Sequence, residues 1–112
     1  MDALAHNPET IIQRLRLAVH EGKKQLRITT HAQVEAAKDG LLLTDLRHIF
    51  EQGRIIEFYS ERQRFLLYEH TLNDQIPVHI VIEDTPDAGV IITAYVPDKR
   101  IWIANMKRRR PK

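Results

Sequence analysis

A chain of 112 residues with 43% hydrophobic and 29% charged residues has the length and composition of one globular domain with a single core. The lack of cysteine excludes disulfide bonds, thiolate metal ligands and a cysteine nucleophile, and no apolar run is long enough to cross a bilayer. The net charge of +2 is distributed unevenly along the chain. Residues 1–98 carry ten basic and fifteen acidic side chains, whereas residues 99–112 carry seven basic and no acidic side chains. We expect a cytoplasmic protein with one domain over residues 1–102, a basic tail over residues 103–112, and no membrane contact.

The first predicted element is a helix that begins at Asn7-Pro8-Glu9. This run supplies a capping side chain, a proline at the first helical position and an acid near the positive end of the helix dipole. Apolar residues follow at helical spacing up to Gly22, which predicts a helix with one face packed against the rest of the domain. Residues 26–29 then alternate as a short strand.

Two further helices are predicted before the period changes. Thr30-His31-Ala32-Gln33 matches a capping box, in which the Thr30 hydroxyl and the Gln33 side chain bond to opposite backbone amides, and this helix runs to Gly40. The next helix starts at a Thr-Asp pair and is predicted over residues 44–53.

His31 lies in the first turn of the second predicted helix. Free backbone amides at that end attract phosphate, and the helix dipole favours the neutral ring that a general base requires. The alternative is that the capping box only starts a helix and that His31 is a solvated first-turn residue.

From Arg54 onward the apolar residues alternate with a period of two. Four strands rich in β-branched and aromatic residues are predicted at Ile55–Tyr59, Arg64–His70, Ile76–Glu83 and Val90–Val96. Short turns separate them, which is typical of an antiparallel meander, and the earlier helices would cover one of its faces. The sequence therefore predicts an α+β domain with N-terminal helices packed on one face of a four-stranded antiparallel sheet.

The third of these strands contains His79. Alternation places three aliphatic side chains on one face, the one we expect under the helices, and His79 on the other. On the uncovered face His79 could transfer protons. The alternative is a structural histidine paired with a backbone carbonyl or with a cross-strand partner.

Other polar side chains are predicted to join this face. Glu57 and Tyr59 alternate with apolar residues, and Glu57 could orient a histidine or act as a base. Ile91, Thr93 and Tyr95 are predicted to share one side of the last strand. Tyr95 could stack on a nucleobase or donate from its phenol, and Thr93 could hold a phosphate oxygen. Both are also ordinary strand residues with high β-propensity.

Arg62 and Arg64 lie in and beside the turn after the first of the four strands. They could stabilise negative charge that develops in a transition state. A solvated turn explains both arginines as well. No pair of the six histidines has close ligand spacing, and no phosphate-binding glycine loop is present, so we expect neither a metal nor a cofactor.

A basic run ends the chain, formed by Lys107, Arg108, Arg109, Arg110 and Lys112. Without acidic neighbours it would contact the phosphates of RNA, or an acidic partner. The alternatives are a disordered solubilising tail, and a tail that folds back on the acidic body or binds a second copy.

Seven short motifs occur in an order that resembles domain-of-unknown-function (DUF) family 4258. They are Thr30-His31-Ala32, Gly40-Leu41, Asp45-Leu46, Gly53-x-Ile55-Ile56-Glu57-x-Tyr59, Pro77-Val78-His79-Ile80-Val81 and Ile91-Ile92-Thr93-Ala94-Tyr95-x-Pro97-Asp98, followed by Trp102. The resemblance spans residues 27–102, and only the first helix and the last ten residues lie outside it.

Such proteins look like distant relatives of the RelE/ParE-like toxins, which pack helices on a curved antiparallel sheet. The resemblance implies a toxin of a toxin–antitoxin pair that cuts messenger RNA, often on the ribosome, with a zinc-ribbon type antitoxin as its partner. Glu35 and Asp39 stand where a common form of the family pattern has arginines. If those arginines bind RNA in relatives, that contact is missing here.

The leading hypothesis, which the resemblance implies, is a metal-independent ribonuclease. Such cleavage needs a base for the 2′-hydroxyl, an acid for the leaving oxygen and a group that stabilises the phosphorane charge. His31 and His79 would transfer protons, and Tyr95, Glu57 and Arg64 would assist. The alternative is a non-catalytic module of the same fold that binds a protein partner through its sheet or basic tail, which the acidic body and the missing arginines favour. A DNA-binding regulator ranks third, because no helix-turn-helix with a basic second helix is evident.

Overall fold

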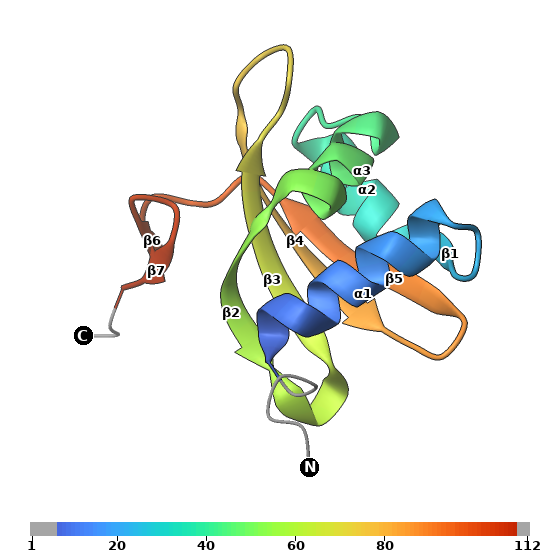
Figure 1. The fold of residues 1–112 in the computed structure, drawn as a ribbon. Coiled ribbons are helices and arrows are strands. Elements are labelled where there is room, and N and C mark those ends of the chain that lie inside the picture. The colour runs from blue at the N-terminus through green and yellow to red at the C-terminus, as the bar shows by residue number, and fades with distance from the viewer. Residues whose placement is uncertain (1–6, 110–112) are drawn as a thin grey trace.

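The computed structural model describes residues 7–109, which form three α-helices, a five-stranded sheet and a C-terminal hairpin (Figure 1). The helices are α1 (Pro8–His20), α2 (Thr30–Lys38) and α3 (Leu43–Gln52). The strands are β1 (Gln25–Ile28), β2 (Arg54–Tyr59), β3 (Arg64–His70), β4 (Pro77–Asp84), β5 (Ala88–Tyr95), β6 (Trp102–Ile103) and β7 (Lys107–Arg108). The α+β class and every helix and strand predicted from the sequence are confirmed. Within the described residues, no helix has the length and apolar character needed to cross a membrane.

The cap of α2 lies one residue earlier than the sequence predicts. Thr29, not Thr30, is the N-cap, and its hydroxyl accepts a hydrogen bond of 3.0 Å from the Ala32 backbone amide. The Gln33 side chain donates to the Ile28 carbonyl at 3.0 Å and closes no capping box on Thr30. The shift follows from the preceding strand, because pairing with β5 keeps Thr29 extended, the conformation that an N-cap needs.

The sheet is mixed, with strand order β1-β5-β4-β3-β2. Strands β2 to β5 form the predicted antiparallel meander, but β1 adds a fifth strand that runs parallel to β5. The prediction of a four-stranded, fully antiparallel sheet is therefore wrong in this detail. Two parallel strands must be joined by a long connection, not by a tight turn. The sequence therefore contains no local turn signal that could have predicted the pairing of β1 with β5.

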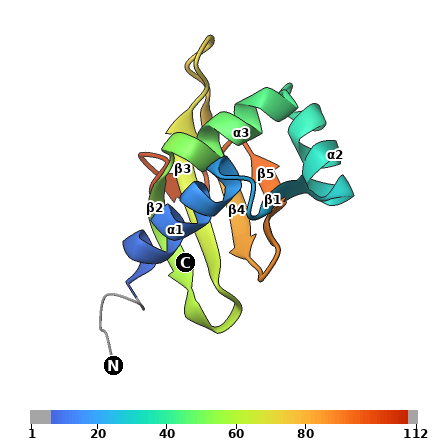
Figure 2. The same ribbon diagram turned by 45° about the vertical axis from the view of Figure 1, so that its right-hand side comes forward.

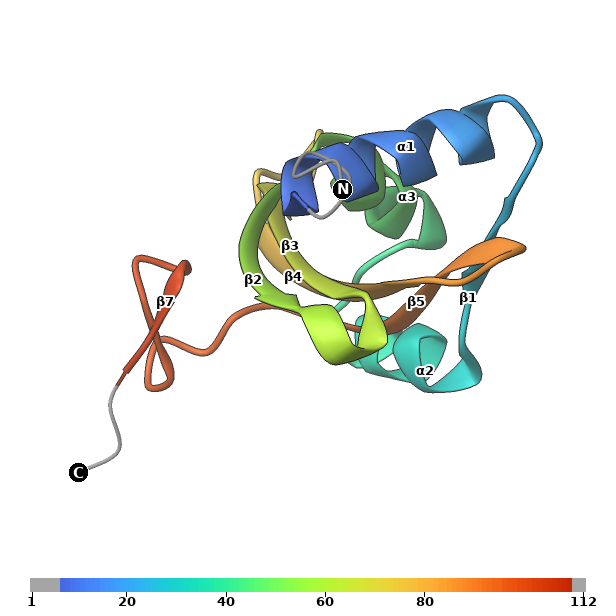
Figure 3. The same ribbon diagram turned by 60° about the horizontal axis from the view of Figure 1, so that its bottom comes forward.

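The helices divide between two places. α1 and α3 lie on one face of the sheet, whereas α2 lies beside β5 on the other side (Figures 2 and 3). Hydrogen bonds hold both ends of α2 to β5 and to the residue that follows it. The Thr29 hydroxyl donates to the Ile92 carbonyl at 3.0 Å, and the Val96 amide donates to the Asp39 carboxylate at 2.9 Å. The expectation that all helices cover one face thus holds for α1 and α3 only.

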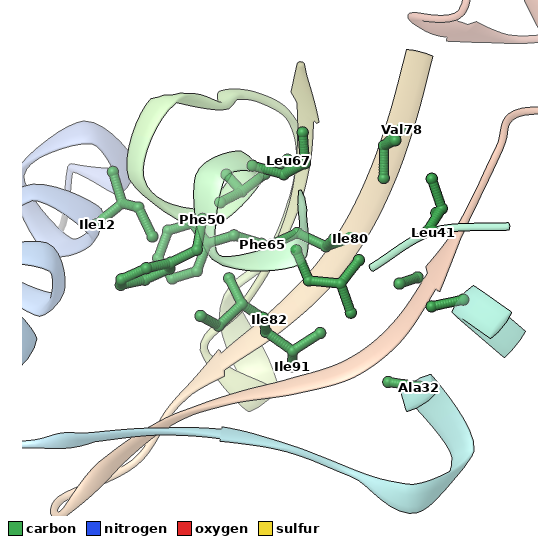
Figure 4. Close-up of a cluster of buried hydrophobic side chains, with 14 of the residues drawn as sticks. Ile12, Ala32, Leu41, Phe50, Phe65, Leu67, Val78, Ile80, Ile82 and Ile91 are labelled. Carbon is green, nitrogen blue, oxygen red and sulfur yellow. The ribbon is translucent and has the colours of Figure 1, made fainter. Parts of the chain in front are cut away.

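The core lies between the sheet and α1 and α3, and it extends to the inner side of α2 (Figure 4). It contains Ile12, Leu15, Ala32, Ala36, Leu41, Leu46, Ile49, Phe50, Phe65, Leu67, Val78, Ile80, Ile82, Ile91 and Ala94. The alternation predicted for β4 is confirmed, because Val78, Ile80 and Ile82 all point into this core.

A bulge in β5 changes one predicted face. Ile82 pairs with Ile91 but Val81 pairs with Thr93, which leaves Ile92 as the extra residue. Ile91 is therefore buried in the core and does not share a face with Thr93 and Tyr95, as strict alternation had predicted. Simple alternation fails here because the bulge moves the following residues by one position.

Part of the predicted basic tail is folded. Strands β6 and β7 pair around a tight turn in which the Met106 amide donates to the Ile103 carbonyl at 3.1 Å. The two central turn residues are left-handed, with φ of 51° at Ala104 and 63° at Asn105. Positive φ at both central residues is a feature of the mirror-image turns that match the twist of β-hairpins. The hairpin lies outside the curve of the sheet, away from α1 (Figure 3).

Candidate functional site

The open face, defined as the face of the sheet opposite α1 and α3, collects three of the four predicted catalytic side chains. Cross-strand pairing places His79 of β4 opposite Tyr95 of β5 on one side and opposite Tyr68 of β3 on the other. Glu57 of β2 pairs with Leu66, which shares this face with Tyr68. Strands β2, β4 and β5 therefore bring Glu57, His79 and Tyr95 to one surface.

His79 is the centre of this arrangement, and it is fully buried. Its Nε2 atom lies 2.5 Å from the Asn105 carbonyl oxygen, and its Nδ1 atom lies 3.2 Å from the Tyr95 hydroxyl. A carbonyl only accepts hydrogen bonds, so Nε2 carries the proton and Nδ1 accepts one from Tyr95 in the neutral ring. The sequence was compatible with either a catalytic or a structural role for His79. The observed contacts, with a backbone carbonyl and with a cross-strand partner, are those expected for the structural role.

Burial sets the protonation of this pair. Loss of solvent lowers the pKa of His79 below 6.5, although the Asn105 carbonyl and the Glu57 carboxylate oppose that shift. Burial also raises the pKa of the Tyr95 hydroxyl to about 12. At neutral pH the pair is therefore an uncharged imidazole that accepts a hydrogen bond from a protonated phenol, a state in which the ring can act as a base.

Glu57 lies beside this pair and is held by two partners. Arg108 of β7 makes a two-pronged contact with its carboxylate, with Nε at 2.9 Å from one oxygen and Nη2 at 3.2 Å from the other. The Tyr59 hydroxyl donates to the same carboxylate. Burial, followed by the hydrogen bond to Glu57, raises the pKa of Tyr59. The carboxylate thus sits between a cation and a phenol.

The C-terminal hairpin covers the site. The Trp102 ring is 3% exposed and meets the His79 ring edge to face, with 4.5 Å between centroids. The Arg108 guanidinium stacks 4.6 Å above the Trp102 ring. Sequence reasoning noted Trp102 as a family motif and Arg108 as a tail residue but assigned neither to this site, and it did not select Asn105. The Ala-Asn pair at the centre of the turn was a weak signal for a hairpin.

A groove of about 680 Å³ lies next to this site on the same face. It brings together three residues predicted to bind RNA, Arg62, Arg64 and Thr93, with Tyr59 at its edge. Arg62 is exposed, whereas Arg64 is paired with Glu83 at 2.9 Å across the β3–β4 ladder. Among the residues that the structure describes, Arg62 has no ion-pair partner. The groove therefore offers its guanidinium, together with hydroxyl groups and the exposed ring of Tyr59.

His31, the fourth predicted catalytic residue, is exposed at the start of α2 and is not among the rings that pack on His79. Thr29, two residues earlier, is bonded to Ile92 of β5, whereas His79 pairs with Tyr95. Three strand residues separate those points, a distance of about 10 Å. The structure does not bring His31 into contact with the open-face residues.

The remaining predicted RNA-binding residues lie on or beyond the hairpin. Lys107 and Arg109 are exposed, and the Arg109 side chain donates to the Lys99 carbonyl at 3.0 Å. Arg110 lies outside the described residues. Asp39, for which the resemblance led us to expect an arginine, accepts a hydrogen bond from the Val96 amide through its carboxylate, so it stabilises the fold at the end of α2.

The open face can therefore provide a neutral base bonded to a phenol and, beside that pair, a carboxylate bonded to a guanidinium. Among the described residues, no group of three or more histidine, aspartate or glutamate side chains is arranged to hold a metal ion. These groups suit proton transfer next to an anion, provided that the hairpin moves aside.

The sequence model of a domain of unknown function, DUF4258, matches residues 28–96, which is more than half of the chain. No curated protein and no solved structure matches this chain. The matched region contains Glu57, His79 and Tyr95 and ends before the hairpin that carries Trp102 and Arg108.

Proposed function

The chain belongs to the DUF4258 family, and we propose that it is a metal-independent ribonuclease of the RelE/ParE-like toxin type, acting on messenger RNA and controlled by an antitoxin. The observation that carries the proposal is the convergence of His79, Tyr95 and Glu57 on the open face, with Arg108 beside them. The adjoining groove with Arg62 and Thr93 supplies a path for the RNA strand.

The chemistry is an attack of the RNA 2′-oxygen on the neighbouring phosphorus. Its proton passes to the Tyr95 oxygen while the proton of Tyr95 moves to Nδ1 of His79, and the nearby Glu57 carboxylate stabilises the resulting imidazolium once the hairpin has moved aside. Arg108 stabilises the phosphorane charge. The bond to the 5′-oxygen breaks, and that oxygen takes a proton from a water molecule. The hydroxide left behind recovers the proton of the His79 imidazolium, and the products are a 2′,3′-cyclic phosphate and a 5′-hydroxyl.

In this proposal His31 contacts the RNA strand outside the reacting phosphate. Its exposed position at the start of α2 suits an anion contact at a helix end. Arg64 assists less than Arg62, because Glu83 neutralises its charge.

The second candidate is a non-catalytic module that binds a protein partner through its sheet or its basic hairpin. It is favoured by one specific observation, which is that both nitrogens of His79 and the Glu57 carboxylate already have partners within the chain. Such a saturated set stabilises a fold without any substrate.

The deciding experiment compares Tyr95→Phe with Tyr68→Phe. Both tyrosines flank His79, but only Tyr95 bonds to it. The proposal predicts that purified wild-type protein cleaves single-stranded RNA and arrests growth when expressed. Tyr95→Phe should lower the cleavage rate about 10²- to 10⁴-fold, while Tyr68→Phe stays near wild type. Intact RNA with folded wild-type protein would eliminate the ribonuclease and leave the binding module.

A further inference from the structure

The C-terminal hairpin is attached to the sheet by few contacts. β6 and β7 form a two-stranded sheet of their own, with no ladder to β2–β5. Its polar contacts with the open face are the Asn105 carbonyl on His79 and the Arg108 guanidinium on Glu57. The buried Trp102 ring adds the apolar contact. An element held in this way can leave the sheet without unfolding the core.

The charges of the two parts differ in sign. Residues 1–98 carry a net charge of −5, while every charged residue from Lys99 onward is basic. In the closed state Arg108 is neutralised by Glu57, so a phosphate that approaches it also meets that carboxylate. Away from the sheet, Lys107, Arg108 and Arg109 would face phosphates with no acid beside them.

A ligand shifts an equilibrium toward the state that it binds more tightly. For a chain of phosphate groups, that state is the one with the hairpin off the sheet, because there the Glu57 carboxylate no longer competes with phosphate for the Arg108 guanidinium. The same movement uncovers His79 and Tyr95, since Trp102 and Asn105 leave with the hairpin.

We propose that residues 102–108 form a displaceable cover over His79, and that a chain of phosphate groups opens it by taking Arg108 from Glu57. The cover controls the site to which we assign ribonuclease activity, and its opening by RNA in particular rests on that proposed function. Opening by polyphosphate does not depend on that proposed function.

Trp102 makes this movement measurable, because it is the only tryptophan of the chain. The experiment follows Trp102 emission and its quenching by acrylamide in the full-length protein at constant ionic strength. The two probes are a linear polyphosphate and a single-stranded oligoribonucleotide. Either probe should raise the quenching constant several-fold and shift the emission to the red, while far-UV circular dichroism stays unchanged.

Variants test the Arg108–Glu57 pair itself. Glu57→Gln should expose Trp102 without any ligand, because it removes the charge that holds Arg108. Glu61→Gln is the matched control, since it removes the same charge from an exposed turn and should leave the quenching at the wild-type value. Arg108→Gln is the second variant, in which Trp102 should be exposed from the start and insensitive to polyphosphate.

The outcomes separate the two proposals. The proposal of a displaceable cover is contradicted if Trp102 remains shielded at saturating polyphosphate. It is also contradicted if Trp102 remains shielded in the folded Glu57→Gln and Arg108→Gln variants. Opening by polyphosphate with no response to RNA and no cleavage supports the cover and counts against the ribonuclease. RNA cleavage with Trp102 shielded throughout would keep the ribonuclease activity, but it would contradict the cover and the assignment of cleavage to His79, which lies beneath Trp102.

Discussion

The two faces of the sheet are stabilised in different ways. The face under α1 and α3 is lined by apolar side chains that pack with the helices into one buried cluster. The open face carries a histidine, tyrosines and a carboxylate, which are covered by a short hairpin. Among the described residues, no buried side-chain nitrogen or oxygen lacks a hydrogen-bond partner. The same strands thus have an apolar face that stabilises the fold and a polar face whose groups satisfy one another.

This difference implies that the two faces respond to different changes. Apolar burial contributes in proportion to area and is lost only when the core opens. The polar face depends on a few directional contacts and on the charge of its groups. Substitutions and pH should therefore separate a global transition from a local opening of the hairpin.

The largest expected effect is the loss of a core aromatic ring. Phe65→Ala removes a fully buried side chain that packs 4.9 Å from the Phe58 ring, and we expect the free energy of unfolding to fall by about 3–5 kcal/mol. Urea denaturation followed by far-UV circular dichroism measures this loss. The contrasting variant is Trp102→Ala on the hairpin, for which we expect a loss below about 1.5 kcal/mol, because the hairpin can detach before the core unfolds. Equal losses for the two variants would show that both faces belong to one cooperative unit.

An intermediate effect is expected from acidification. Burial keeps the pKa of His79 in the closed state below the value of 6.5 expected for an exposed ring. Its contribution to closure is therefore complete above pH 6.5 and is lost as the pH falls below it. Tyr68 and Tyr95 face the ring without charge, and the Glu57–Arg108 pair is the charged group beside it. We expect quenching of Trp102 to rise between about pH 7 and about pH 5.

Two histidine variants assign this pH response. His79→Gln should remove it, because no imidazole remains beneath Trp102. His31→Gln changes an exposed histidine and should keep it. A response that persists in His79→Gln would contradict the assignment to this ring.

The smallest expected effect comes from the hairpin turn. Ala104 adopts a left-handed φ of 51°, which strains any residue with a Cβ atom, so Ala104→Gly should favour the closed hairpin by about 1 kcal/mol. Weaker acrylamide quenching of Trp102 than in the wild-type protein would show this shift toward the closed hairpin. Ala37→Gly is the matched control at an exposed position of α2, where glycine should lower the free energy of unfolding by about 0.5–1 kcal/mol. Stronger quenching in Ala104→Gly would mean that the turn does not limit closure.

Much of the fold was predictable because its signals are local. The helix start at Asn7, the strands from Arg54 onward and the inward face of Val78, Ile80 and Ile82 follow from capping chemistry and from period. The cap of α2 was missed by one residue, because pairing of Thr29 with β5 decided between two adjacent threonines.

The candidate site was predictable only in part. Glu57, His79 and Tyr95 were correctly expected on one face, since alternation within each strand places them there. The contacts that cover them could not be predicted, because they join residues far apart in the chain. His79 meets the Asn105 carbonyl 26 residues later, and Glu57 meets Arg108 51 residues later.

From sequence alone, the chain determined its family, its α+β class and the side chains that share each strand face, because local periodicity and turn chemistry depend on near neighbours. Tertiary structure decided that β1 joins β5 in parallel, that a bulge buries Ile91, and that a hairpin built from the basic end closes over His79. Each of those outcomes depends on how surfaces from distant segments fit together. No local pattern carries that information, because the same local pattern is compatible with several packings.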